Sequence, residues 1–143
     1  MAGSRYVLTE FSASTEEKYI RDRIYELLSS GYKPIVAHIE RYKCMKDIEL
    51  VEYLVNKGAY MQVNADSVIG KNGHGVKKYC GKLLEDELVQ FIGSDCHGSK
   101  RRVTRIGDAY AYVSKKFGCQ AADEIFIDNP QEILDNAKHC LSL

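Results

Sequence analysis

Apolar stretches of strand type alternate with segments of helical periodicity along most of the chain. We expect strands at residues 5–11, 33–39, 59–67 and 88–95, and helices at 15–31, 46–58, 75–87, 102–118 and 130–140. A further short strand, at an edge or in a loop, is predicted at 123–129. Strands that alternate with helices are typical of parallel sheets. The sequence therefore predicts an α/β fold with about four parallel strands and outer helices.

The length of the chain limits how complete such a fold is. A full (β/α) barrel takes roughly 200 residues or more, whereas this chain has 143. We expect one domain over residues 1–143, with residues 1–4 resembling a cloning remnant because a strand begins directly after them. The alternatives are an open sheet or part of a larger barrel, and the abrupt start favours the second. An open barrel edge invites pairing with another strand, so we expect homo-oligomers through it.

Composition excludes several functional classes. The 20 basic and 20 acidic residues balance, so no net charge draws the protein to nucleic acid or membrane. No apolar run approaches the length of a membrane span, and no signal-peptide pattern is recognised, so we expect a cytoplasmic protein. The five cysteines are odd in number and scattered, which argues against a disulfide framework or a zinc knuckle. We expect reduced thiols, mostly buried.

A polar residue stands at the end of each main strand. Glu10 follows YVLT, His38 follows PIVA, Asn64 follows YMQV and Asp95 follows FIGS. Any one of these is readily explained as a solvated loop residue. Because the carboxyl ends of parallel strands face one shared region, four in register are better explained by convergence on a common site.

The segment FIGSDCHGSKRR, residues 91–102, has two interpretations. Cys96 and Arg102 have the spacing of a thiolate phosphatase loop, in which a cysteine of lowered pKa attacks phosphate. The flanking carboxylate of Asp95 would instead raise a thiol pKa. In the other interpretation, Asp95 and His97 project to one side of an extended segment as metal ligands, and Cys96 points away into the packing.

The metal interpretation is favoured because further ligands accompany the Asp-x-His pair. Adding Glu10 and His38 gives two carboxylates and two imidazoles, a set suited to manganese, iron or zinc. Taken alone, His38 is explained as a buried, hydrogen-bonded core histidine.

Several segments together resemble the PHP superfamily of polymerase and histidinol phosphatases. PIVAHIERY is similar to its His-Pro-Glu-Arg-Tyr segment, and YVLTEF, MQVNADSVIGKNG and IGSDCHGSKRR follow in the order seen in the manganese-dependent protein-tyrosine phosphatases of bacterial capsule and exopolysaccharide synthesis. The resemblance implies the C-terminal portion of a distorted (β/α) barrel of the PHP type with a trinuclear metal site, usually manganese.

The resemblance also implies individual roles. Glu10 matches a bridging carboxylate, His38 an imidazole ligand, and Asp95 with His97 the C-terminal ligand pair. Arg41 and Arg102 match arginines that hold substrate phosphate. The implied activity is metal-dependent hydrolysis of phosphotyrosine on a bacterial tyrosine kinase of polysaccharide synthesis. The alternatives are a small-molecule phosphatase of the histidinol-phosphate type and a non-catalytic metal-binding or scaffold fragment.

The chain departs from the family pattern in two places. Ile39 replaces the usual proline, which affects the turn after His38 more than the ligand itself. The N-terminal His-x-His motif and the acidic ligands after it are absent, so we expect the N-terminal barrel strands to be missing and the isolated chain to be inactive.

Other polar residues leave their roles open. Glu40 is either an outer partner of His38 or an exposed acid, and His74 lies in a loop that is either solvated or folded over the site. Asn64 and Ser67 either orient a ligand or form a turn. For His139, in the last helical turn, an interaction with the helix dipole is favoured.

Overall fold

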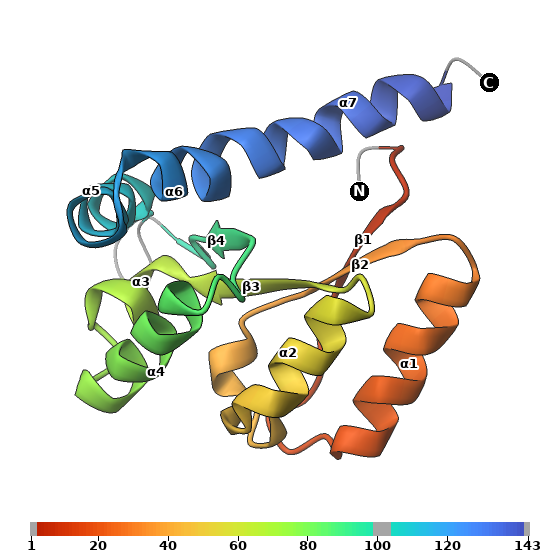
Figure 1. The fold of residues 1–143 in the computed structure, drawn as a ribbon, viewed down its shortest axis with the longest axis horizontal. Helices are drawn as coiled ribbons and strands as arrows, with labels where there is room; N and C mark the ends of the chain where they lie inside the picture. The colour runs from red at the N-terminus through yellow and green to blue at the C-terminus, as the bar shows by residue number, and fades with distance from the viewer. Residues whose placement is uncertain (1–2, 99–103, 142–143) are drawn as a thin grey trace.

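A computed structural model of the chain describes residues 3–98 and 104–141. Its centre is a sheet of parallel strands that pair in chain order (Figure 1). The strands are β1 (Tyr6–Thr9), β2 (Lys33–Val36), β3 (Tyr60–Asn64) and β4 (Phe91–Gly93). The parallel α/β fold expected from the alternation of strands and helices is therefore confirmed.

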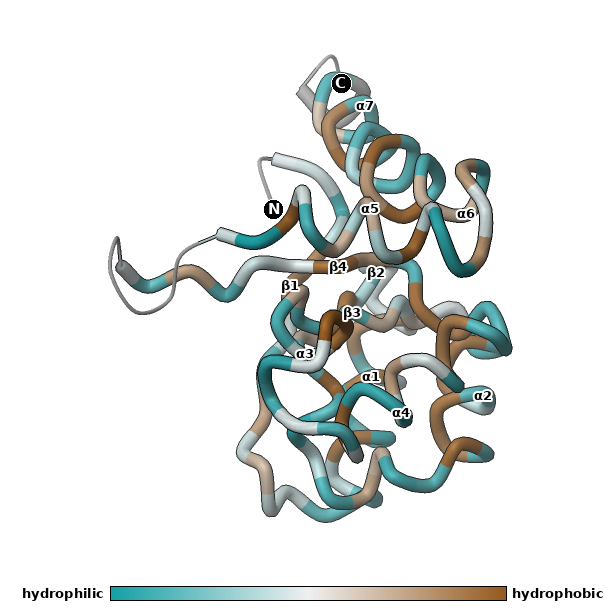
Figure 2. The backbone as a smooth tube through the Cα atoms, turned by 90° about the vertical axis from the view of Figure 1, so that its left-hand side faces the viewer, coloured by the Kyte–Doolittle hydropathy of each residue, from teal (hydrophilic) through white to brown (hydrophobic). Residues whose placement is uncertain are grey.

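Helices lie on both sides of this sheet. They are α1 (Glu17–Ser29), α2 (Ile48–Asn56), α3 (Ala65–Ile69), α4 (His74–Glu85), α5 (Ile106–Phe117), α6 (Cys119–Asp123) and α7 (Asn129–Leu141), with short helical turns η1 (Ile39–Arg41), η2 (Cys44–Lys46) and η3 (Glu124–Asp128). In both views α1, α2 and α4 lie on one side of the strands and α7 on the other, with the apolar stretches of β3 and β4 (brown in Figure 2) between them. No helix of the described part is both long and apolar enough to cross a membrane.

The alternation of side chains along the strands divides the core between these two sides. Val36 of β2 packs in the larger cluster with Ile20 and Ile24 of α1. The preceding residue, Ile35, packs in a smaller cluster on the opposite face, where Ile133 of α7 covers it. Successive strand residues point to opposite faces, so a continuous apolar run is what a sheet covered on both faces requires.

The strand predicted at 123–129 is wrong, because this segment is helical from α6 through η3 into α7. A strand would bury Ile125 and Ile127 on one face, whereas Ile125 is 8% exposed and Ile127 is 55% exposed. The buried residues are Ala122 and Ile125, at helical spacing. Pro130 lacks an N–H group and its ring would clash with a carbonyl one turn earlier, which accounts for the widened π-type turn just before it.

All four predicted strands are longer than the paired ones, and β3 and β4 show where the pairing stops. β3 ends at Asn64, and the residues after it form α3 rather than continuing to residue 67. Pairing of β4 is limited to Phe91–Gly93. Both strands end where their shared register ends, because residues beyond it have no partner strand for their backbone hydrogen bonds. The helix predicted at 102–118 begins at Ile106 in the structure. Residues 102 and 103 of the predicted range lie outside the described part.

Candidate functional site

Polar side chains gather in a cleft of about 610 Å³ at the carboxyl ends of the strands. Its lining includes these residues singled out from the sequence: Glu10, His38, Arg41, Asn64, Asp95 and His97. The strand ends therefore meet at one place, as parallel pairing requires. Whether these residues act as ligands stays a prediction. Arg102, the second predicted phosphate-binding arginine, lies outside the described residues.

Two strand ends reach the cleft through left-handed backbone. His38 has φ 39° and Asp95 has φ 46°, a region that residues other than glycine rarely occupy. If β2 continued, alternation would point His38 toward α1, as it does Val36. Because β2 stops at Val36, the turn after it brings the imidazole into the cleft instead. Such conformations cost about 1–3 kcal/mol and persist only where surrounding contacts hold them.

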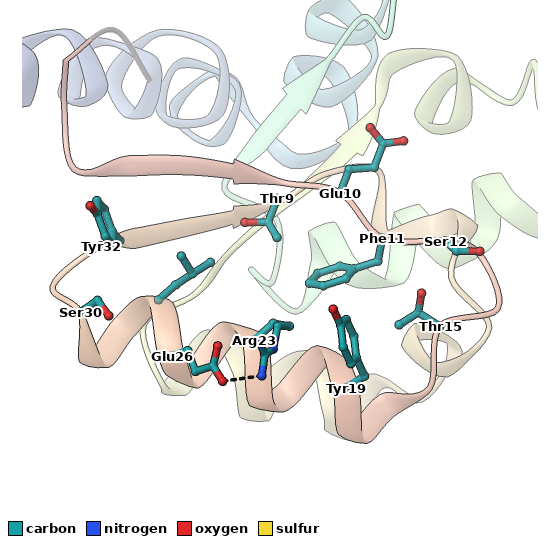
Figure 3. A pocket seen from close by; sticks show the side chains of 11 residues that line it. Thr9, Glu10, Phe11, Ser12, Thr15, Tyr19, Arg23, Glu26, Ser30 and Tyr32 are labelled. Carbon is teal, nitrogen blue, oxygen red and sulfur yellow. Dashed lines mark hydrogen bonds and ion pairs between the residues drawn. The ribbon is translucent and has the colours of Figure 1, made fainter.

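Glu10 and His38 form the first of two pairs in the cleft. Nε2 of His38 lies 3.0 Å from Oε1 of Glu10. The histidine side chain is buried, whereas the glutamate side chain is 70% exposed. Figure 3 shows Glu10 on the opposite side of the chain from Phe11, which points toward α1. The Nδ1 atom of His38 is buried with no hydrogen-bond partner among the described residues.

The hollow that Figure 3 displays is a separate pocket of about 530 Å³ between β1 and α1. Phe11 and Tyr19 lie along it, and the charged side chains of Arg23 and Glu26 pair with each other. In this pocket Arg23 and Glu26 neutralise each other, and the side chain of Glu10 points away from α1. The pocket therefore lacks the converging polar groups of the strand-end cleft.

Asp95 and His97 form the second pair, and Asp95 also accepts hydrogen bonds from two further side chains. Its Oδ1 lies 2.9 Å from Nε2 of His97, and its Oδ2 accepts hydrogen bonds from Nη2 of Arg41 and, at 3.4 Å, from Nδ2 of Asn64. Burial raises the pKa of the Asp95 carboxyl, but the hydrogen bond and charge of Arg41, together with His97, outweigh it and leave the pKa below its ordinary value. The carboxylate is thus held in its charged form.

Gln62 joins the two pairs and was missed by the sequence reasoning. Its Oε1 accepts the backbone N–H of His38 at 2.7 Å, and its Nε2 donates to Oδ1 of Asn64 at 3.1 Å. The residue lines the cleft and is 9% exposed. A signal for it existed, because Gln62 and Asn64 alternate with the buried Met61 and Val63 and so share the cleft face of β3.

Glu40 is buried, which excludes its reading as an exposed acid. Its Oε1 accepts the backbone N–H of Asn64 at 3.1 Å and the hydroxyl of Ser67 at 2.7 Å. The carboxylate therefore anchors the junction of β3 and α3 rather than the ring of His38. Asn72 in turn donates to the Ser67 hydroxyl at 2.9 Å, while His74 is exposed at the start of α4. The side chain of His139 lies outside the described part.

The donor types in the cleft suit a divalent metal, but their arrangement falls short of a complete site. In residues 3–98 and 104–141, no group of three or more histidine, cysteine, aspartate or glutamate side chains is placed to hold a metal ion. Glu10 with His38 and Asp95 with His97 stand as two separate pairs. The described residues therefore do not make a metal centre by themselves.

The expected burial of Cys96 and of most cysteines is wrong. Cys96 and Cys119 are exposed, Cys44 is half-buried, and of the described cysteines only Cys80 is buried. The chain leaves regular strand structure after Gly93, so the alternation that would have turned Cys96 inward no longer applies. The Cys96 thiol instead approaches the carbonyl oxygen of Gly98 at 3.5 Å.

Comparison with known proteins finds one family and relatives that carry the same functional name. A family model described as capsular polysaccharide synthesis, CpsB/CapC, matches residues 1–135. Tyrosine-protein phosphatase CpsB of Streptococcus pneumoniae is 36% identical over 137 residues, which are 92% of this chain and 56% of the relative. Tyrosine-protein phosphatase YwqE of Bacillus subtilis strain 168 is 32% identical over 118 residues, or 82% and 46% of the two chains.

The fold has a solved counterpart. A crystal structure from work on YwqE of Bacillus subtilis and CpsB of Streptococcus pneumoniae, described as metal-dependent tyrosine phosphatases, matches with a TM-score of 0.75 and 30% identity. The match covers 97% of this chain and 53% of the other. The chain thus spans about half the length of the curated relatives it matches.

Proposed function

The chain belongs to the CpsB/CapC family of capsular polysaccharide synthesis, and on that premise we propose that the complete protein is a metal-dependent protein-tyrosine phosphatase. The observation that carries the proposal is the cleft in which strand-end carboxylates, imidazoles and an arginine converge. The names of the relatives support the same activity. Because this chain spans about half of those relatives, the activity is assigned to the complete protein rather than to these 143 residues.

Glu10, His38, Asp95 and His97 are the proposed metal ligands. Their mixed oxygen and imidazole donors suit Mn²⁺, with Fe or Zn as alternatives, and up to three ions would need further ligands from outside this chain. The buried Nδ1 of His38, which has no hydrogen-bond partner among the described residues, and the charged Asp95 carboxylate support the assignment. A metal ion in such a site would supply hydroxide and stabilise charge at the phosphate.

Arg41 and Arg102 are the proposed phosphate-binding residues. Arg41 lines the cleft, and its side chain is 39% exposed. A guanidinium has five N–H donors, of which the contact with Asp95 uses one nitrogen, so donors remain for phosphate oxygens. Arg41→Lys would keep the positive charge and lose the forked geometry, which is expected to raise KM more than it lowers kcat.

The proposed substrate is a phosphotyrosine-bearing protein, a bacterial tyrosine kinase of polysaccharide synthesis, acted on in the cytoplasm. The involvement of the family in capsule synthesis supports this choice. Scattered cysteines without a described disulfide are typical of a reducing compartment.

A second candidate function applies to residues 1–143 in isolation. In it, the chain is a non-catalytic fragment that folds but does not turn over substrate. The two-pair arrangement of the ligand candidates favours it.

The test compares the complete protein with residues 1–143 on a phosphotyrosine peptide and on histidinol phosphate, each with Mn²⁺ and with a chelator. We expect Mn²⁺-dependent release of phosphate from the peptide by the complete protein alone. Preference for histidinol phosphate would replace the proposal with the small-molecule phosphatase. Activity that survives complete removal of metal would refute it.

A further inference from the structure

Gln62 lines the strand-end cleft, and both polar atoms of its side chain are hydrogen-bonded. The side-chain oxygen accepts the N–H of His38 at 2.7 Å. The side-chain nitrogen donates to the carbonyl oxygen of Val63 at 2.6 Å and to Oδ1 of Asn64 at 3.1 Å. A buried amide bonded on both sides has its orientation fixed, because turning it would leave buried donors and acceptors unpaired.

These bonds form a continuous connection between the two pairs of the cleft. On one side, Gln62 holds the backbone of His38, whose φ of 39° is strained and whose ring contacts Glu10. On the other side, Gln62 orients Asn64, which donates to Asp95 at 3.4 Å. The amide therefore sets the position of one pair relative to the other without being a ligand itself.

Gly93 leaves the space that Gln62 occupies. A Cβ atom at residue 93 would stand 2.7 Å from Nε2 of Gln62, closer than side chains approach each other. The backbone of Gly93 is outside the left-handed region, so alanine is conformationally acceptable there and the conflict is with Gln62 alone. β3 and β4 pair at this point, with Asn64 opposite Gly93.

We propose that Gln62 is a positioning residue that fixes the geometry between the His38 and Asp95 halves of the site, and that Gly93 is required to keep it in place. The inference rests on the proposed phosphatase function and deepens it. It goes beyond the ligand and phosphate-binding residues, since it assigns a role to an uncharged side chain and to the glycine of β4 that leaves space for it.

The experiment uses the complete protein and measures Mn²⁺ affinity, kcat, KM and the midpoint of urea unfolding. Gln62→Met keeps the shape and removes all three hydrogen bonds, and Gly93→Ala displaces the native amide. Gln90→Met is the matched control, because Gln90 also accepts a neighbouring-strand N–H, from Met61 at 2.9 Å, but does not line the cleft. Gly107→Ala controls for the glycine change, since outside its own helix no atom of the described residues lies within 4 Å of its added Cβ.

We expect Gln62→Met and Gly93→Ala each to weaken Mn²⁺ binding or lower kcat by about 10–100-fold, the range typical of outer partners of metal ligands. The two control variants should stay within about twofold of wild type in both quantities. In a Gln62→Ala background, adding Gly93→Ala should change little further, because the atom it would displace is gone.

Two results would overturn the inference. One is equal losses of Mn²⁺ affinity and kcat in Gln62→Met and Gln90→Met, which would show a general effect on the sheet. The other is full additivity of the changes at residues 62 and 93. If wild type binds Mn²⁺ but hydrolyses no phosphotyrosine, the proposed function fails, while the comparison of Mn²⁺ affinities still decides the role of Gln62.

Discussion

Replacing Glu40 tests whether a buried carboxylate, rather than apolar packing alone, holds the end of β3 in place. Its Oε1 receives the N–H of Asn64 and the hydroxyl of Ser67, and its Oε2 has no partner among the described residues. Hydrogen bonds to a charged group contribute about 1.5–3 kcal/mol each. Glu40→Ala removes both and leaves the Asn64 N–H buried, so we expect a loss of at least about 3 kcal/mol in the free energy of unfolding.

Glu40→Gln removes the negative charge but keeps a side-chain oxygen that accepts hydrogen bonds. The amide keeps an oxygen for the two donors and places an N–H₂ group at the position of Oε2, which has no partner in the part of the chain that the structure describes. We expect it to cost about 2–3 kcal/mol and less than Glu40→Ala, because two neutral hydrogen bonds of about 0.5–1.5 kcal/mol each replace two bonds to a charged group of about 1.5–3 kcal/mol each. Glu52→Ala, at an exposed position of α2, is the control and should stay within about 0.5 kcal/mol of wild type.

The assay is urea unfolding of residues 1–143 followed by circular dichroism. With a urea dependence of about 2 kcal/mol per molar for a domain of this size, a loss of about 3 kcal/mol lowers the midpoint by about 1.5 M. The reasoning is refuted if Glu40→Ala costs less than about 1 kcal/mol. It is also refuted if Glu40→Gln is as damaging as Glu40→Ala, since the charge would then matter more than the acceptor.

The site and the sheet lead to four further predictions. The lowered pKa of Asp95 stabilises the fold at pH values above the ordinary carboxyl pKa of about 3.9, and this contribution is lost as pH falls through the lowered pKa. The stability difference between wild type and Asp95→Asn should therefore shrink from pH 6 to pH 3 in urea titrations, and a constant difference would contradict it. Cys96→Ala should leave phosphatase activity of the complete protein intact, because the metal interpretation gives the thiol no role; loss of activity would favour the thiolate. In mass-spectrometric labelling of the native chain, Cys96 should react before Cys80, whose pKa burial raises to about 12. Because β1 ends the described sheet and its Leu8 is 53% exposed, residues 1–143 should self-associate in light scattering, and a monomer at high concentration would exclude this.

Local chemistry was enough to predict the frame of the fold and most of the candidate site. Short apolar runs of strand type, separated by segments of helical spacing, placed the four strands of the described sheet, and the residues at their ends identified where polar groups would meet. This works because a parallel pairing brings every carboxyl end to the same edge regardless of what the loops do. The segment 123–129 shows the limit, since Glu-Ile-Phe-Ile-Asp has strand propensity and its helical form depends on packing of Ile125 against distant residues.

The sequence therefore indicates which residues reach the cleft, whereas the way they are held there depends on contacts between distant segments. The N–H of His38 is bound by a side chain 24 residues away, and Arg41 meets Asp95 across 54 residues. Such contacts depend on the spacing of neighbouring strands and on left-handed backbone at His38 and at Asp95, neither of which leaves a local pattern. Gln62 illustrates the difference, because its residue type and strand face can be read from the sequence. Its function as a link exists only when β2 and β4 lie on either side of it.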